Sequence, residues 1–196
     1  AVQAERQLAF EDAARLRDMA LDALRAVERP TTAWRCELVI GRARALLAAR
    51  RVPEAWAAAR EAAALARELG SGDQLARAAL LLSDYVLADS SEPVALLDEA
   101  YGMLSGEPGE MRAQVACALS QMLWYYGQSE RRVALAAEAR DVARASGDVR
   151  LEISALLATR HARHSPEHLG ERIDAMTEAL ALAERAGHET HRCLVL

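Results

Sequence analysis

The sequence predicts an all-α protein, a right-handed α-solenoid of antiparallel helix hairpins. The 196 residues include 44 Ala and 28 Leu, both strong helix formers, whereas aromatic residues make up only 4% of the chain. Clusters of residues typical of turns also recur every 37 to 42 residues, an interval that holds two helices. Repeated helix pairs with this period are typical of solenoids.

Two sets of turn-like clusters predict where the helices begin and end. The first set separates repeats, at 28–31, 70–73, 106–110, 146–148 and 187–189. The second set divides each repeat into two helices, at 50–53, 90–93, 127–129 and 164–166. We therefore expect ten helices, at about 2–27, 32–50, 53–69, 73–88, 92–104, 110–126, 129–146, 149–163, 167–186 and from 189 onward. They form one repeat domain over 1–196, with repeats at 1–30 (half), 31–70, 73–105, 109–146, 148–187 and 189–196 (truncated).

The residues at these breaks have the chemistry of helix ends. Four glycines stand where a residue after a helix adopts positive φ: Gly70, Gly127, Gly147 and Gly187. Five polar residues are placed to cap the next helix: Asp73, Ser91, Ser129, Asp148 and Ser165. All five prolines lie in or beside breaks, where a missing N–H does no harm.

Two helices show a clear apolar face. In the 53–69 helix, small or apolar residues recur at helical spacing: Ala55, Ala59, Ala62, Ala66 and Leu69. In the 167–186 helix, the same spacing gives Leu169, Ile173, Met176, Leu180 and Ala183. A face made of alanine lets helices approach closely, which favours the stacking of helix pairs.

Composition limits the possible functions. All 24 basic residues are Arg, so a phosphate-loop lysine and Schiff-base chemistry are excluded. A net charge of -5 argues against direct nucleic-acid binding, and no apolar run approaches the roughly 20 residues of a membrane span. The three cysteines, at 36, 117 and 193, suggest buried thiols in a reduced cytoplasmic setting. The absence of Lys and Asn indicates a GC-rich bacterial genome, and the two ends suggest a fragment of a longer protein.

The second helix of each pair resembles the tetratricopeptide repeat, in which an Ala near the helix start is followed by a small residue seven positions later. Ala55 and Ala62 fit this pattern, as do Ala95 and Gly102. Later repeats carry β-branched residues at the first small position: Val133 and Ile173. The repeats are therefore degenerate relatives of the tetratricopeptide pattern.

A second resemblance extends over nearly the whole chain. It is carried by FEDAARL at 10–16, RCEL at 35–38, ALARELG at 64–70 and HSPEHLGER at 164–172. These segments are similar to the helical-repeat region of the large ATP-binding LuxR-type transcriptional regulators of actinobacteria. The resemblance implies a signal-transduction ATPase before the repeats and a DNA-binding helix-turn-helix domain after them. It also implies that the repeats sense a ligand or partner and control the ATPase.

Seven residues are candidates for a ligand or partner groove on the concave face: Asp84, Tyr85, Met122, Tyr125, Tyr126, Arg160 and His161. We expect the first helix of each pair to line that face, and Tyr and Met are adaptable contact residues for peptides and small molecules. The other reading of the aromatic run at 122–126 is packing between repeats. The ligand would be a protein, a peptide or a small molecule.

Three histidines are weak candidates for a metal site: His161, His164 and His168. Pro166 interrupts the helix between the last two, so a solvated corner is the other reading. No pattern of catalytic residues is present, and we expect neither catalysis nor a cofactor. The sequence thus favours a non-catalytic interaction module, the sensor region of a regulator. A free-standing adaptor or peptide receptor is the second hypothesis, and an all-helical enzyme is the third.

Overall fold

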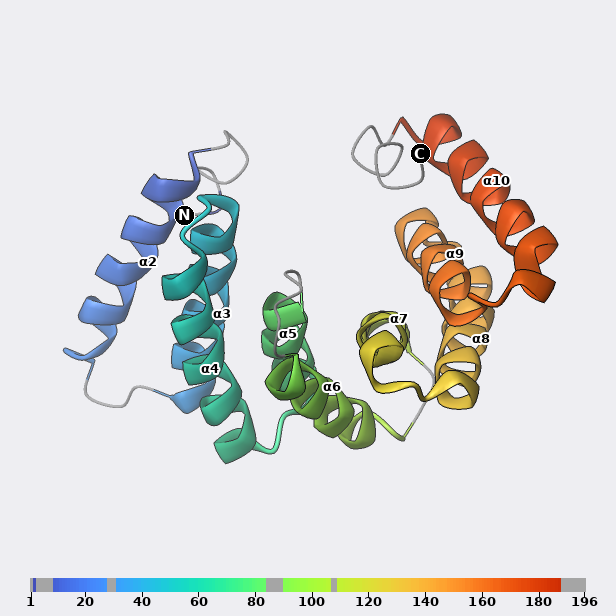
Figure 1. Ribbon diagram of the computed structural model, residues 1–196. Coiled ribbons are helices and arrows are strands. Elements are labelled where there is room, and N and C mark those ends of the chain that lie inside the picture. The colour runs from blue at the N-terminus through green and yellow to red at the C-terminus, as the bar shows by residue number, and fades with distance from the viewer. Residues whose placement is uncertain (1, 3–8, 28–30, 84–89, 107–108, 188–196) are drawn as a thin grey trace. The chain divides into compact units, whose positions relative to one another are not determined.

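The computed structural model describes residues 2, 9–27, 31–83, 90–106 and 109–187, apart from the Tyr125 side chain. Within this part of the chain all regular secondary structure is helical, so the all-α prediction is confirmed. The chain divides into two compact units, Ala1–Ala88 and Asp89–Leu196, coloured blue to green and green to red in Figure 1. None of the described helices combines the length and apolar character needed to cross a membrane.

Unit 1 (Ala1–Ala88) contains four described α-helices: α2 (Phe10–Leu24), α3 (Thr32–Ala48), α4 (Val52–Leu69) and α5 (Gly72–Ser83). Each helix packs against the next in the chain, and α3 also contacts α5. The small side chains predicted for the face of α4 are buried, which confirms the first four positions of that stripe. Leu69 at its end is exposed. The Cys36 thiol of α3 contacts the Ala62 carbonyl oxygen at 3.5 Å, so alanine allows close approach here.

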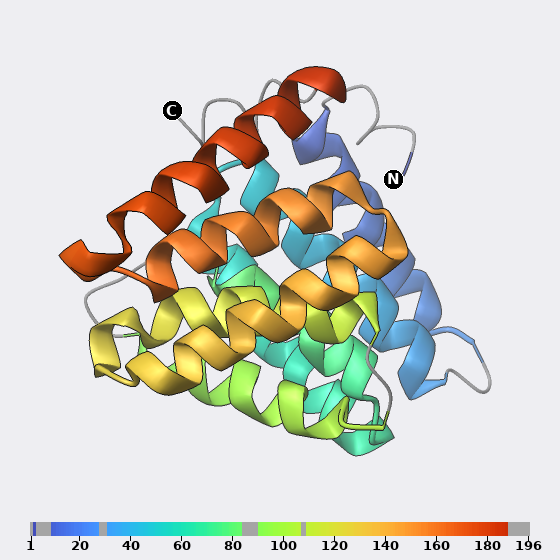
Figure 2. The same cartoon turned by 90° about the vertical axis from the view of Figure 1, so that its right-hand side faces the viewer.

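Unit 2 (Asp89–Leu196) contains α6 (Ser91–Met103), α7 (Glu110–Met122), α8 (Ser129–Ser146), α9 (Val149–Ala162) and α10 (Leu169–Arg185). Two short 3₁₀-helices, η1 (Leu123–Tyr126) and η2 (Pro166–His168), follow α7 and precede α10. Figure 2 shows α9 between α8 and α10, and α7 also packs against α9. Ile153 and Leu156 of α9 are fully buried against alanines of α10.

The apolar stripe of α10 is only partly buried. Ala183 is buried and Leu180 is half-buried, whereas Leu169 and Ile173 are exposed. The expected single buried face is therefore confirmed only near the end of α10, because no described helix covers its first turns. The predicted helix from residue 189 lies outside the described residues.

The helix ends agree with the predicted glycines but not with all the predicted caps. Gly70, Gly127, Gly147 and Gly187 all adopt positive φ. Asp148 caps α9, since its carboxylate accepts hydrogen bonds from the backbone N–H groups of residues 150 and 151. Three of the predicted caps lie inside helices instead of before them: Asp73, Ser91 and Ser129. Ser165 precedes η2 without a capping bond from its side chain.

The two units contain a helix pair repeated at an offset of 77 residues. The α4 helix begins at 52 and α8 at 129, and both have 18 residues. Both pairs carry an ion pair between their two helices, Arg35–Glu61 in unit 1 and Arg112–Glu138 in unit 2. The left-handed residues that end the four helices also correspond, Arg50 to Gly127 and Gly70 to Gly147. The repeat is therefore present in backbone conformation and in side-chain contacts.

Candidate functional site

The predicted groove residues do not form one surface. Met122 is 3% exposed and belongs to the core, so its assignment to a ligand surface is wrong and the packing reading holds for it. Tyr126 is exposed in η1. Asp84, Tyr85 and the Tyr125 side chain lie outside the described residues. Only Arg160 and His161, both half-buried at the end of α9, lie among other groups of functional character.

A buried arginine organises the region around His161. Arg132, in the first turn of α8, is 5% exposed. Its guanidinium Nε donates to the carbonyl oxygen of Ser120 at 3.3 Å, and Nη2 donates to the carbonyl oxygen of His161. These carbonyls lie in the last turns of α7 and α9, where helix dipoles leave partial negative charge. The Ser120 hydroxyl donates back to the Arg132 carbonyl oxygen at 2.9 Å, so the α7–α8 contact is bonded in both directions.

Trp124 connects this arginine to the start of α10. The Arg132 guanidinium lies 4.7 Å from the centroid of the Trp124 ring, a cation–π contact. The other contact of the ring is with His164, whose centroid is 4.1 Å away at an interplanar angle of 88°. The 3₁₀ conformation of η1 thus places an aromatic ring between α8 and the α9–α10 connection.

His161 lies in a strongly positive environment. Its Nε2 is 3.2 Å from Nη2 of Arg160. Burial, followed by the charges of Arg160, Arg132, His164 and Arg172, lowers the pKa of His161 from 6.5 to about 4. The imidazole is therefore neutral near pH 7, and none of the groups that shift its pKa is a carboxylate.

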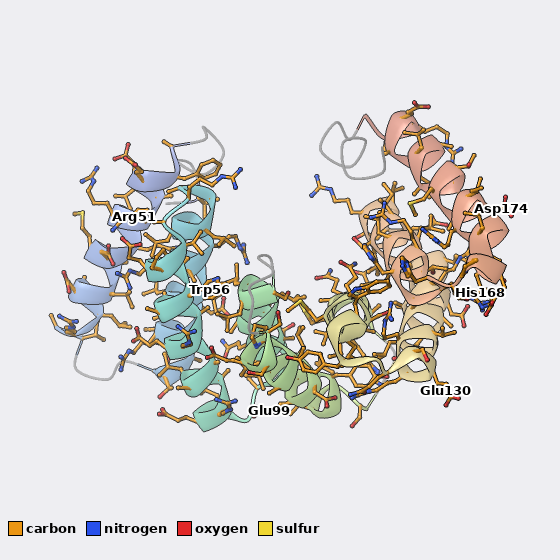
Figure 3. The ribbon with its side chains drawn as sticks, viewed as in Figure 1. Arg51, Trp56, Glu99, Glu130, His168 and Asp174 are labelled. Atoms are coloured by element: carbon orange, nitrogen blue, oxygen red, sulfur yellow. The ribbon has the colours of Figure 1, made fainter. Side chains whose placement is uncertain are left out.

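Arg172 completes the group from α10. Its Nη1 donates to the carbonyl oxygen of His164 at 3.3 Å, and its Nε is buried without a hydrogen-bond partner among the described residues. Carboxylates at this junction are engaged elsewhere: Glu171 contacts Arg163 at 2.7 Å and His168 at 3.2 Å. Figure 3 labels His168 at this junction. We refer to Arg132, Arg160, His161, His164 and Arg172 as the cationic cluster.

The three histidines proposed as weak metal candidates do not come together as ligands. His164 packs against Trp124, and His168 contacts Glu171. No group of three or more His, Cys, Asp or Glu in the described part of the chain is arranged to hold a metal ion. The solvated-corner reading fits better the half-buried or exposed positions of these side chains.

The cysteines that the structure describes are buried thiols, as expected. Burial raises the pKa of Cys36 to about 11 and that of Cys117 to about 12. Thiols with such pKa values are poor nucleophiles at neutral pH, since the thiolate is the reactive form. Cys193 lies outside the described residues.

A cavity of about 430 Å³ opens between α8, α9 and α10, beside the cationic cluster. Its arginines differ from those of the cluster because each contacts a carboxylate. Arg140 and Arg144 approach Glu178 at 2.8 and 4.0 Å, and Arg163 contacts Glu171. The cavity is therefore close to charge balance, whereas the cluster is not.

Sequence reasoning identified two members of the cluster as ligand residues and missed the arginine at its centre. Arg160 and His161 were selected for their place in the first helix of a repeat. Arg132, Trp124 and Arg172 gave no motif. The available signal was the 77-residue offset, which places Arg132 at the position of the buried Ala55.

The chain matches no protein-family model, and it has no match among curated proteins.

Proposed function

We propose that this chain is a non-catalytic helical-repeat module that binds a ligand or partner. The observation that carries the proposal is the helix pair repeated after 77 residues, with the same interhelical ion pair in both copies. Repeat arrays of this kind present surfaces for binding, while their internal positions serve packing. The distance of 77 residues equals two of the 37- to 42-residue intervals in the sequence.

Within each unit, the proposed arrangement is a right-handed α-solenoid of antiparallel, tetratricopeptide-like hairpins. Two features support it: each helix packs on its neighbour in the chain, and α3–α5 and α7–α9 pack as next-but-one neighbours. A stacked array has both kinds of contact because the first helix of each pair lies beside the first helix of the next.

The role we propose for the module is that of a sensor in a large ATP-binding LuxR-type transcriptional regulator. The four segments that resemble this family support the proposal. A ligand would favour one conformation of the repeats, and differential affinity for that conformation would bias an attached ATPase. The protein would then be cytoplasmic, and DNA binding would belong to a separate domain of the same chain.

Two measurements test this role. The coding sequence on either side of residues 1 and 196 should contain an ATPase domain upstream and a helix-turn-helix domain downstream. In that parent protein, a ligand of the repeats should change the rate of ATP hydrolysis, and a substitution that removes ligand binding should abolish the change. A parent chain without a nucleotide-binding domain would contradict the regulator role and leave a free-standing adaptor as the function.

A further inference from the structure

The cationic cluster lacks the carboxylates that accompany arginines elsewhere in the protein. Three of its members are arginines: Arg132, Arg160 and Arg172. None of the three forms an ion pair with a carboxylate among the described residues. Arg132 and Arg172 donate to backbone carbonyls, and the only side-chain partner of Arg160 is the imidazole of His161. Three positive charges thus gather at one helix junction of a chain whose net charge is -5.

Other half-buried arginines follow a different rule. Arg42 pairs with Asp18, Arg77 with Glu37, and Arg112 with Glu138, all across helix interfaces. Gathering like charges without counter-charges destabilises the folded chain, so such an arrangement is unusual unless an anion compensates it. The exception at the α9–α10 junction therefore suggests that the compensating charge comes from outside the chain.

The cluster also has free capacity to donate hydrogen bonds. The Nε of Arg172 is buried and has no acceptor among the described residues. Nη2 of Arg160 contacts His161 at 3.2 Å, where the imidazole can accept this bond or, when it is protonated, donate to an anion. His164 is exposed beside them, so the group is open to solvent.

We propose that the cluster binds the phosphate group of a small ligand, with Arg160, His161, His164 and Arg172 as its donors and Arg132 as a positioning residue. A phosphate dianion presents three acceptor oxygens and up to two negative charges. This charge offsets most of the excess carried by the three arginines. Guanidinium groups bind phosphate through two parallel hydrogen bonds, and several of them converging from two helices favour a tetrahedral oxyanion.

Arg132 acts from the protein interior. Its guanidinium occupies the carbonyls at the ends of α7 and α9 and lies over Trp124, so it cannot also face a ligand without losing these bonds. By capping the His161 carbonyl oxygen, it offsets the partial negative charge of the α9 terminus, which would otherwise repel an anion at this point. It also fixes Trp124, against which His164 packs.

The phosphate site rests on the proposed function, for which it supplies a ligand chemistry. Its test is direct binding to the chain 1–196, and this does not require an ATPase. A failure of the regulator role therefore leaves the binding result unchanged, and a failure of phosphate binding leaves the repeat module intact.

Isothermal titration with inorganic phosphate and with glycerol 3-phosphate gives the first readout, with malonate as a dicarboxylate comparison. We expect saturable binding of phosphate with one site per chain and about tenfold weaker binding of malonate. Tighter binding of glycerol 3-phosphate than of phosphate would indicate a phosphorylated metabolite, and equal binding would indicate the free anion. Both results support the site. Equal affinity for malonate would overturn the assignment to phosphate.

Variants locate the site. Arg160→Ala and Arg172→Ala should each weaken phosphate binding about tenfold, whereas Arg150→Ala should leave it unchanged. Arg150 is a matched control because it is an exposed arginine on the same helix as Arg160. Equal loss with Arg150→Ala, or no loss with either cluster variant, would overturn the proposal.

A spectroscopic readout covers variants that fold poorly. In histidine NMR spectra of the wild-type chain, phosphate should raise the pKa of His161 from about 4 toward its ordinary value, because a bound dianion offsets the neighbouring cations. The exposed variant His164→Asn should fold normally and show a smaller rise. An unchanged titration of His161 at saturating phosphate would overturn the proposal.

Discussion

The α3–α4 pair of unit 1 and the α7–α8 pair of unit 2 repeat one design with different interiors. At three corresponding positions, unit 1 has Ala43, Leu47 and Ala55, all buried in its apolar core. Unit 2 has Ser120, Trp124 and Arg132, which form hydrogen bonds and a cation–π contact. The helix lengths and left-handed ends are otherwise in register. The same backbone can thus hold either an alanine-lined contact or a buried cation, and the cation supplies the electrostatic basis for a site.

The largest effect should come from exchanging the interiors in the direction the fold does not provide for. Ala55→Arg places a cation among the apolar side chains of α2 and α3, including Ala13 and Leu47. We expect this variant to lose more than about 4 kcal/mol of unfolding free energy, because overpacking and an uncompensated buried charge add. Urea denaturation measures the loss. Ala57→Arg, on the exposed face of the same helix, should change stability by less than about 0.5 kcal/mol. Similar losses in both variants would contradict the comparison.

The reverse exchange, Arg132→Ala, should cost about 3 kcal/mol. It leaves the carbonyl oxygens of Ser120 and His161 without their charged donor and removes the cation–π contact with Trp124. Arg131→Ala is the matched control, since its neighbouring arginine forms a partly exposed ion pair with Asp98. That control should cost about 1 kcal/mol or less. If denaturation gave equal costs for the two variants, Arg132 would not hold the ends of α7 and α9.

Acid should affect unit 2 before unit 1. All five histidines are in unit 2, and His161 has its pKa lowered to about 4. Between pH 6.5 and pH 4 the unfolded chain binds a proton at His161 that the folded chain does not. Stability therefore falls as the pH drops through this window, by about 3 kcal/mol at pH 4. In unit 1, burial works to raise the pKa of Glu37, but hydrogen bonds from Arg77 and Gln74 outweigh it and lower the pKa. This carboxylate loses its contribution only at more acidic pH.

Unfolding free energy measured at several pH values tests this difference. His161→Gln should remove most of the loss between pH 6.5 and 4.5, whereas His168→Gln should not, because His168 lies beside the carboxylate of Glu171. A wild-type stability that is constant over this range would contradict the positive environment of His161.

The smallest expected difference concerns the repeated ion pair. Glu138 accepts a 2.6 Å hydrogen bond from Arg112 and a 2.5 Å bond from the Tyr101 hydroxyl, while the Arg112 guanidinium lies 3.8 Å from the centroid of the Tyr101 ring. Glu61 accepts one bond, from Arg35, in a more exposed position. Glu138→Gln should cost about 1 to 2 kcal/mol, and Glu61→Gln less than about 1 kcal/mol. A larger cost at Glu61 would show that network size does not set the strength of the pair.

The sequence predicted the elements of the fold because their signals are local. The αL conformation of Gly70 or Gly147 and the cap at Asp148 depend on residues within one helical turn. Capping by Ser129 was wrong because the helix begins one residue earlier than that cap requires, a shift of a single residue that the pattern does not resolve.

The site was less predictable because its partners are distant in sequence. Arg132 contacts carbonyls of Ser120 and His161, which are 12 and 29 residues away. A polar residue in the first turn of a helix is ordinarily exposed, and nothing near Arg132 in the sequence indicates its burial. Met122 was misassigned for the opposite reason, because its neighbours suggest a surface while tertiary packing places it in the core.

Hydrogen exchange with and without saturating inorganic phosphate tests the central claim most directly, because it compares the two units in one sample. The account predicts increased protection in peptides that cover 120–132 and 157–173, and none in peptides that cover 32–70. Equal protection in the corresponding peptides of both units, or none in either, would contradict the assignment of an anion site to the exchanged interior of unit 2.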